Sequence, residues 1–560
     1  MVLAFACADC GSTSVTLDAV ISKHHNDRGR VPLSSIASLL QSNNSPTIVQ
    51  FKGLKESVNS VDEALDQLSI DIHEMSEALA RLKERRGQLA DVKDKYQIAL
   101  TPIRRVQPEI LMEIFWQTMD SGYNVLDVKD GPWNLGRVCS KWRMIVNYHS
   151  SKLWSKPRCH ITTVGPFPKN SLSLLTTALS RSGQHDLSIT FYDIGTDRVS
   201  FETISALLHL FMNHSTRWRE ARLCLRPTLC DALTVVRGRV PALSVLGFTC
   251  LPPAQVSVDA FEIAPRLSNV MLHGMGENAR VPIPVSGLVS FQDDRVYADL
   301  ATTRYFLDII GKAPQLQTFE VGYHHIDGDV SLSHNQRIRN PSLKSFDACD
   351  SNLIRSLELP SLRSIYLMRS AMADDSDSEV LTSPDALSAL HEMLSHSQCS
   401  LTLNHLIIHE AYIDANVIGI VEISPQVTSF SLHADNGRWS KASDEVCRQL
   451  LSRMAETAVD NKHSVLPHLE HYDMSIESNP HDGDITFVNG DLMKMVSSRW
   501  TKSPLKSVTI TLSTTPRIQL IGPEMLSRED VRTLRAYRAA GLDIKVQADD
   551  HDSMDRLRYV

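Results

Sequence analysis

Cysteine and histidine residues near the start of the chain have types that could bind zinc. Cys7 and Cys10 form a Cys-x-x-Cys pair that precedes the adjacent histidines His24 and His25. Thiolate and imidazole are the usual zinc ligands, but paired histidine ligands are normally separated by about three to five residues. An isolated Cys-x-x-Cys pair in a polar leader is more often incidental than functional. The sequence therefore predicts no zinc site here.

His391, Glu392 and His396 form a second cluster, close to the helical His-Glu-x-x-His motif of zinc proteases. The spacing between the histidines is one residue too long. Positions five apart on a helix are rotated by about 500°, which leaves the two imidazoles about 140° apart. The two rings would not share a metal ion.

Residues 274–279 read Gly-x-Gly-x-x-Ala after an apolar stretch, a pattern close to the glycine motif of dinucleotide-binding domains. Asp293 and Asp294 follow at about the number of residues at which such domains have the acid that binds the ribose. Pro282 and Pro284 prevent the helix whose N-terminus would bind a pyrophosphate. The chain has neither a Gly-x-x-x-x-Gly-Lys-Ser/Thr loop nor a Gly-x-Ser-x-Gly motif. We therefore predict no catalytic residues, no metal and no cofactor, and hence a protein that is not an enzyme.

The composition indicates a soluble protein of several domains, with 560 residues, 42% hydrophobic and 22% charged. A formal net charge of -8 gives no general attraction to nucleic acid or to an anionic membrane. The ten cysteines lack the dense spacing of a disulfide framework. We expect neither a signal peptide nor an apolar stretch long enough to span a membrane, so the sequence predicts a cytoplasmic or nuclear protein.

A heptad pattern follows a leader, residues 1–50, that is expected to be poorly ordered. Apolar residues from Val58 onward alternate at spacings of three and four, and no proline interrupts residues 54–100. This is the a/d seam of a coiled coil, and Arg86 occupies a seam position, where a charge weakens pairing but can fix its register. We expect a long helix over 51–100, ended by Pro102. It either pairs as a coiled coil, for example in a dimer, or folds back onto the next domain. The seam residues are Val61, Leu65, Leu68, Ile72, Met75, Leu79 and Leu82.

A short phrase, small-Pro-x-Leu-x-x-apolar-x-apolar, recurs beyond residue 157. Its proline marks the start of a strand, and its apolar residues alternate on one strand face. Amphipathic helical stretches at 383–396 and 443–459 lie between copies. Strand-plus-helix units that cannot bury a face alone stack into a solenoid. The copies are 240–248, 264–272, 313–321, 340–348, 359–367, 401–409, 424–432, 466–474 and 503–511, with earlier candidates at 186–193 and 219–227.

The predicted fold class is therefore α/β: an N-terminal long helix, a small all-α module at 101–156 and an irregular α/β solenoid at 157–548, with a tail at 549–560. An unrelated α/β domain with parallel strands is the alternative. On the expected strands, the residues between the apolar positions would line one surface, a candidate target-binding face. They are Glu320, Asp347, Tyr366, Ser431, Asp473 and Thr509.

The module at 101–156 has two apolar stripes at helical spacing. Pro108 suits the first turn of the first helix, where a missing N–H costs nothing. A second helix is expected to begin near Trp133, and an apolar pair closes the module. The first stripe comprises Ile110, Leu111, Ile114 and Phe115, the second Leu135, Val138, Cys139, Trp142, Ile145 and Val146, and the pair is Leu153-Trp154.

This segment resembles an F-box, the module that docks on the Skp-type adaptor of cullin-based ubiquitin ligases. The resemblance is carried by residues 108–111, 114–115, 138–143 and 153–154. Together with the preceding coiled-coil helix and the leucine-rich-repeat-like phrases, it makes the chain similar to a group of fungal F-box proteins. It departs from the family in three ways. Val106-Gln107 replaces the usual Leu-Pro, the connection 119–131 is long, and the repeats lack the usual Asn or Cys.

The resemblance implies a substrate receptor of a Skp–cullin–F-box ubiquitin ligase, with the repeats binding an unknown protein target. The alternatives are a repeat scaffold with a vestigial F-box and, more remotely, a metal or nucleotide enzyme. The same apolar residues could instead form a local core facing the repeats. The residues implied in adaptor binding are Pro108, Ile110, Leu111, Ile114, Phe115, Leu135, Val138, Cys139 and Trp142.

Overall fold

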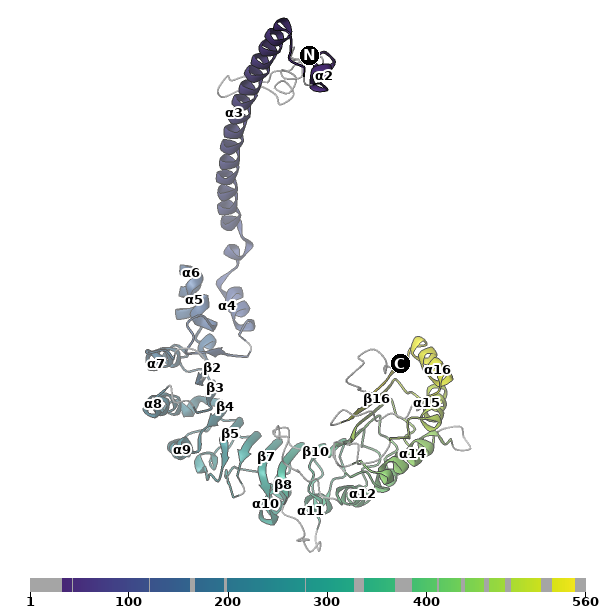
Figure 1. Ribbon diagram of the computed structural model, residues 1–560. Helices are drawn as coiled ribbons and strands as arrows, with labels where there is room; N and C mark the ends of the chain where they lie inside the picture. The colour runs from purple at the N-terminus through teal and green to yellow at the C-terminus, as the bar shows by residue number, and fades with distance from the viewer. Residues whose placement is uncertain are drawn as a thin grey trace. The chain divides into compact units, whose positions relative to one another are not determined.

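The computed structural model forms two compact units, residues 1–110 and residues 111–560, which are described separately (Figure 1). Within the described residues, no helix is both long enough and apolar enough to cross a membrane. The structure describes residues 33–42, 44–119, 121–161, 167–195, 199–276, 278–326, 337–367, 385–409, 412–434, 439–457, 463–478, 485–514 and 526–548.

A single long helix dominates the first unit. Helix α3 (Ile48–Leu100) has 53 residues, so it is about 80 Å long at 1.5 Å per residue. Thr47 begins it with a capping box, and the prediction of a long helix that ends before Pro102 is confirmed. A short helix, α2 (Leu33–Leu40), lies in the predicted leader, most of which is outside the described residues. None of the α3 residues is buried, and its coiled-coil pairing stays a prediction.

The small module contains α4 (Pro108–Gln117), the two-residue strand β1 (Tyr123–Asn124), α5 (Gly131–Val138), α6 (Ser140–Met144), the π turn η2 (Ile145–His149) and the 3-10 turn η3 (Ser151–Trp154). The prediction that α4 begins at Pro108 is confirmed.

The prediction of one continuous second helix from Trp133 is wrong. The chain is extended at Cys139, with φ -159° and ψ 170°, which separates α5 from α6. A break leaves backbone carbonyls of the preceding turn without an intrahelical donor. Here the side chain of Arg143 supplies one, because its Nε donates a hydrogen bond to the carbonyl of Gly136 at 2.9 Å.

Within the described residues, the remainder of the second unit is built on a parallel β-sheet of 15 strands whose spatial order follows the chain order from β1 to β17, except that β9 and β11 pair separately. The strands after β1 are β2 (Pro157–Ile161), β3 (Leu187–Asp193), β4 (Trp218–Leu225), β5 (Val245–Ala254), β6 (Asn269–Met275), β7 (Ser290–Ala298), β8 (Thr318–Ile326), β9 (Ile338–Arg339), β10 (Ser345–Asp347), β11 (Leu357–Glu358), β12 (Ser364–Leu367), β13 (His405–His409), β14 (Ser429–Ala434), β15 (His471–Ser478), β16 (Ser507–Thr514) and β17 (Asp543–Ala548).

Each of the nine predicted repeat phrases overlaps one of these strands, and the two earlier candidates overlap β3 and β4. The prediction of a mixed α/β solenoid is therefore confirmed. Helices or short 3-10 turns connect most strands, and the helices predicted at 383–396 and 443–459 are α12 and α14. The longer helices are α7 (Ser171–Arg181), α8 (Phe201–Met212), α10 (Leu300–Lys312), α12 (Ala386–Ser397), α14 (Lys441–Ala455), α15 (Gly490–Lys502) and α16 (Arg528–Ala539), and the shorter ones are α9 (Pro227–Cys230), α11 (Ser351–Arg355) and α13 (Asn416–Glu422).

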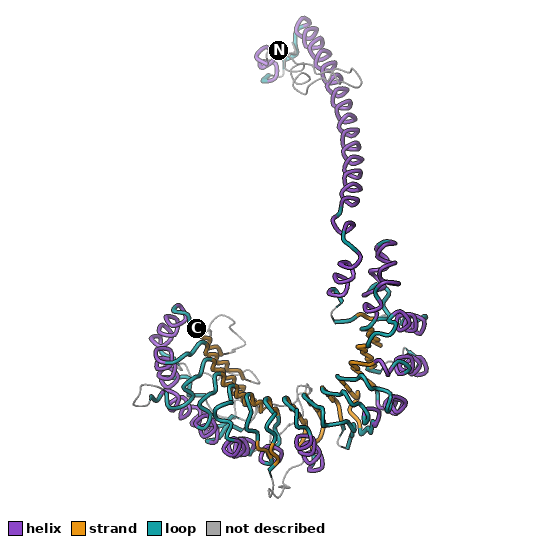
Figure 2. Tube along the Cα trace, turned by 180° about the vertical axis from the view of Figure 1, so that it is seen from behind, coloured by secondary structure: helices purple, strands orange, loops and turns teal. Residues whose placement is uncertain are grey.

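All these helices lie along one face of the sheet (Figure 2). The strands alternate buried and part-exposed residues, as in β14, so the apolar side chains point toward the helices. At the centre of the solenoid, the rings of Phe291, Phe319 and Phe346 stack from strand to strand at 5.6 and 6.2 Å. The opposite face of the sheet carries the part-exposed residues.

Candidate interaction surfaces

Two of the predicted adaptor-binding residues lie in the core of the small module. Leu111 and Phe115 are 0% and 1% exposed, and the Phe115 ring lies 4.6 Å from that of Trp142. Trp154 is also buried and donates a hydrogen bond from Nε1 to the carbonyl of Val146 at 2.9 Å. These side chains hold α4, α6 and the following turns together. Contact between Leu111 or Phe115 and an adaptor would require the module to open.

A second group of apolar side chains is exposed on the same short helices. Ile114 of α4 is 42% exposed, Val138 of α5 is 60% exposed, and Ile110, in the first turn of α4, is 55% exposed. Cys139 is also exposed, while Pro108, Leu135 and Trp142 are half-buried. Met144 of α6, which the sequence reading missed, is 48% exposed. On a continuous helix Met144 would lie about 200° from Trp142, outside the predicted apolar stripe, so its exposure does not depend on the break at Cys139.

The long connection 119–131, a departure from the F-box pattern, forms the first strand of the solenoid sheet. Tyr123 and Asn124 of β1 pair in parallel with Pro157 and Arg158 of β2. Asp130 holds the turn, because its carboxylate accepts hydrogen bonds from the N–H of Asn124 and from the N–H of Gly131, each at 2.7 Å. The module and the repeats therefore share one sheet.

An open pocket of about 570 Å³ lies where the module meets the first repeats. The Nζ atoms of Lys152 and Lys156 lie 4.1 and 4.6 Å from the centre of the Trp116 ring, an arrangement that stabilises both cations. Ser188 and Glu220, from β3 and β4, form another part of its wall and are hydrogen-bonded to each other at 2.6 Å. Cationic and anionic groups both line this pocket, so it has no single charge preference.

The predicted target-binding residues lie in one row across the sheet. Glu320 pairs in register with Asp347, and Asp347 with Tyr366. Ser431 pairs with Asp473, and Asp473 with Thr509. Between the two groups the row passes through Ile407 of β13, and it ends at Lys545 of β17. The phrase therefore predicted equivalent positions on six strands, and the role of these six residues in binding stays a prediction.

The open face of the sheet, which is the face opposite the helices, carries basic side chains paired with carboxylates toward both of its ends. Arg158 of β2 and Arg222 of β4 lie in the same register row at the N-terminal end, where Arg222 is paired with Glu220 at 2.7 Å. Toward the C-terminal end, His433 Nε2 lies 3.2 Å from the Asp473 carboxylate, and the rings of His409 and His433 lie 5.2 Å apart. A target with several charged and polar groups would match this face better than an apolar one.

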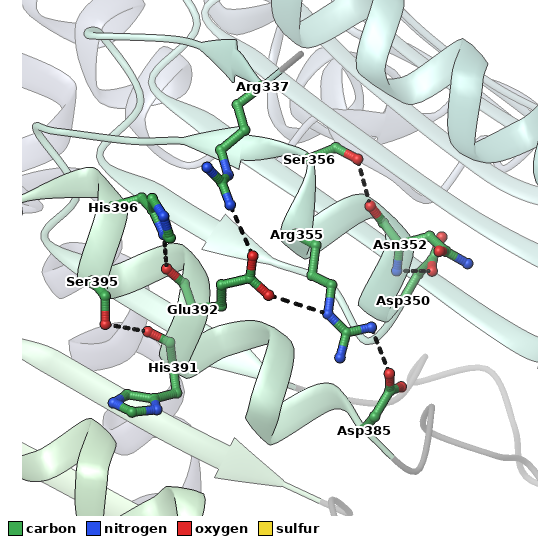
Figure 3. A network of polar contacts seen from close by, with 10 residues as sticks. All are labelled: Arg337, Asp350, Asn352, Arg355, Ser356, Asp385, His391, Glu392, Ser395 and His396. Carbon is green, nitrogen blue, oxygen red and sulfur yellow. Dashed lines mark hydrogen bonds and ion pairs between the residues drawn. The ribbon is translucent and has the colours of Figure 1, made fainter. Parts of the chain in front are cut away.

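The cluster His391, Glu392 and His396 has a structural role in α12 (Figure 3). The Glu392 carboxylate pairs with Arg337 at 2.8 Å and with Arg355 at 3.5 Å, which joins α12 to neighbouring segments. His396 Nδ1 lies 2.7 Å from the Glu392 carbonyl, while the His391 imidazole points to the other side of the helix. Among the described residues, no group of three or more His, Cys, Asp or Glu side chains is arranged to hold a metal ion. Cys7, Cys10, His24 and His25 lie outside those residues.

Close backbone packing accounts for the glycines of the 274–279 motif. A Cβ on Gly274, whose φ is +66°, would lie 2.2 Å from the carbonyl oxygen of Cys250. A Cβ on Gly276 would meet the backbone of Ala254 at 2.6 Å. No helix occurs between residues 278 and 289, where a dinucleotide site would require one. Both glycines are needed where β5 and β6 end side by side.

Asp293, considered above as a ribose-binding acid, is fully buried and paired with Arg295 at 2.7 Å. Burial raises the pKa of Asp293, while the adjacent Arg295 guanidinium acts in the opposite direction. Arg295 also donates a hydrogen bond to the carbonyl of Ala279 at 3.1 Å. The pair therefore anchors the motif segment from within the core, and its carboxylate does not face solvent.

No protein-family model and no curated protein matches the chain. Among solved structures, the complex of Rad7 and Elc1 from yeast is similar at 12% sequence identity and a TM-score of 0.32, over 82% of this chain and 97% of that one. A protein from Bacteroides fragilis is similar at 13% identity and a TM-score of 0.27, over 66% of this chain and 91% of that one. At these TM-scores neither similarity bears on function.

Proposed function

We propose that the chain is a substrate receptor of a Skp–cullin–F-box ubiquitin ligase, which docks on the Skp-type adaptor through the module at 101–156. The observation that carries the proposal is the division of its apolar residues. Leu111, Phe115 and Trp154 fill the core, whereas Ile114 and Val138 remain exposed on short helices. The exposed set is only partly covered by the module's own packing. Together with the F-box-like sequence, this favours a partner groove as its place of burial.

Burial of the exposed apolar side chains would supply part of the free energy of such docking. Full burial of one exposed Ile, Val or Met side chain contributes about 1.5–3 kcal/mol. Ile114, Val138 and Met144 are each already about half covered, so their further burial would contribute roughly half of that figure per residue. Short apolar helices that insert into a groove are an established mode of recognition. The open face of the solenoid would then hold the target protein near the ligase.

Co-purification with a Skp-type adaptor tests the proposal. In the full chain, Ile114→Asp and Val138→Asp each place a charge in the proposed contact without entering the core, and each should reduce the retained adaptor at least ten-fold. Leu401→Asp is the matched control, because Leu401 is 76% exposed and lies in the solenoid. Phe115 is unsuitable for this test, since a charge at a buried position would unfold the module.

The adaptor experiment also separates the two non-enzymatic functions. If the wild-type chain retains no adaptor, or if both aspartate variants retain as much as Leu401→Asp, the receptor proposal is wrong. A chain that binds protein targets through its open face but binds no adaptor would be a repeat scaffold with a vestigial F-box. Asp347→Lys and Ser431→Arg, both on the predicted face, should weaken target binding while leaving the adaptor bound.

A further inference from the structure

Helix α3 exposes an apolar seam along its whole length. With Val58 at position a and Val61 at position d, every a and d position from Phe51 to Leu100 is apolar except Arg86 and Lys93. The side chains of the seam are largely in solvent, as shown by Ile72 at 63% and Leu82 at 69% exposure. A helix with this pattern gains stability when a second helix covers the seam.

The charged residues at and beside the seam do not suit a parallel pair of identical helices. In a parallel, in-register dimer, Arg86 would face Arg86 of the partner subunit, and Lys93 would face its own counterpart. The flanking g and e positions would offer no compensation, because Asp71 would lie opposite Ser76 and Arg85 opposite Ala90. Two layers of like charges would weaken this arrangement.

We propose that α3 forms an antiparallel coiled coil with α3 of a second copy of this chain. In the proposed register, Leu65 packs against Leu89 of the partner subunit, and Met75 packs against Leu79 of the partner subunit. Antiparallel pairs bring g positions opposite g positions. Asp71 then lies opposite Arg85 of the partner subunit, and symmetry produces this ion pair twice.

The two seam cations are also accommodated in this register. Arg86 packs against Leu68 of the partner subunit, so no cation faces another cation. Lys93 packs against Val61 of the partner subunit, next to the carboxylate of Asp62 of the partner subunit. A shift of one heptad in one direction would place Lys93 beside Lys55 of the partner subunit, and a shift in the other direction would place Asp71 opposite Val92 of the partner subunit, away from Arg85. The charge pattern therefore selects the register as well as the direction.

The same pattern identifies the partner as a second copy. Asp71 and Arg85 are equally far in sequence from Ala78, so a two-fold axis near the middle of the helix exchanges one with the other. A surface that is complementary to itself after a two-fold rotation is the defining property of an isologous dimer. This pairing is independent of adaptor docking, which uses the module at 101–156.

Disulfide formation between full-length chains tests the direction and register. Two differently tagged chains carry Leu65→Cys and Leu89→Cys, respectively, with Cys7, Cys10 and Cys139 replaced by serine in both. The antiparallel register predicts a disulfide only between the two different chains. In that register, a dimer of two Leu65→Cys chains holds its two introduced thiols about 24 residues apart along the axis, or about 36 Å. Disulfides between identical chains would show parallel pairing, and no disulfide at all would show that the seam is not a dimer interface. Either result overturns the proposal.

A charge-reversal cycle supplies the second test. Asp71→Arg alone and Arg85→Asp alone each replace two attractive pairs with two unfavourable contacts, so each should weaken dimerisation of the full chain about ten-fold in sedimentation equilibrium. The double variant should recover most of the affinity. If the two single effects simply add in the double variant, these residues do not face each other and the proposed register is wrong.

Discussion

Arg499 of α15 is the residue whose removal should destabilise the solenoid most clearly without touching either proposed interface. Its side chain is 0% exposed and donates three hydrogen bonds to backbone carbonyls. Nε donates to Met454 at 2.8 Å, Nη1 to Leu466 at 2.8 Å and Nη2 to Val465 at 2.5 Å. It therefore joins the end of α14, the following loop and α15. Leu466 has a φ of +46°, a left-handed conformation that a leucine adopts only when its surroundings hold it.

The expected change in unfolding free energy for Arg499→Met is the sum of two opposing contributions. Three hydrogen bonds from a charged donor are worth about 6 kcal/mol in total, at about 2 kcal/mol each. Burial lowers the pKa of Arg499 to about 10, from an ordinary value of 12.5. Since one pKa unit corresponds to about 1.4 kcal/mol, keeping the charge buried costs about 3 kcal/mol, which the substitution returns. The expected loss of unfolding free energy is therefore about 3 kcal/mol.

Urea denaturation and amide hydrogen exchange measure this loss. The urea midpoint of Arg499→Met should fall, and exchange should accelerate in residues 463–469 and in α15 while β3 stays protected. Arg499→Lys is the matched control, because it keeps the charge but cannot reach three carbonyls, and it should lose at least as much stability as Arg499→Met. A Met variant within about 1 kcal/mol of the wild type would refute the reasoning.

Three further predictions concern single positions. Gly274→Ala should lower the urea midpoint by the equivalent of about 2 kcal/mol or more, because the new Cβ meets the carbonyl of Cys250 in a left-handed conformation; an unchanged midpoint would contradict it. Asp444→Asn should lower the free energy of unfolding by about 2 kcal/mol, which thermal unfolding would measure. Asp444 accepts hydrogen bonds from the N–H groups of residues 486 and 487 at 2.6 and 3.2 Å and from the Thr486 hydroxyl. Burial, with Arg158 nearby, lowers the pKa of His160, so the unfolded chain binds a proton more readily. The free energy of unfolding should therefore fall as the pH drops below 6.5, the ordinary pKa of histidine. In His160→Gln this fall should be smaller, which unfolding experiments between about pH 7.5 and about pH 5 would measure.

The elements that the sequence predicted well are those set by local patterns. The heptad spacing needs no tertiary contact to show a long helix, and α3 follows it to Leu100. In the repeat phrase, proline placement and strict alternation together mark the strand and its faces. That is why Glu320 and Asp347, chosen from the pattern alone, lie in register on adjacent strands.

The features that the sequence did not predict depend on contacts between distant residues. The break at Cys139 accompanies a hydrogen bond from the Arg143 side chain to Gly136, which no helical periodicity reveals. Tyr123 forms a strand because Pro157, much later in the chain, provides a neighbouring backbone. Strand β7 begins at Ser290, and Ser286 stands four residues before it, where the phrase has its proline, so this copy did not match.

The agreement between strand order and chain order has a consequence for how the protein is made. Each strand from β1 onward pairs only with strands of neighbouring repeats in the sequence, so no distant ends need to meet before the sheet can grow. Low contact order of this kind favours rapid folding, since little loop-closure entropy must be lost at each step. A ribosome delivers the chain from its N-terminus. The small module and β1 could therefore form the template on which later repeats are added one at a time during synthesis.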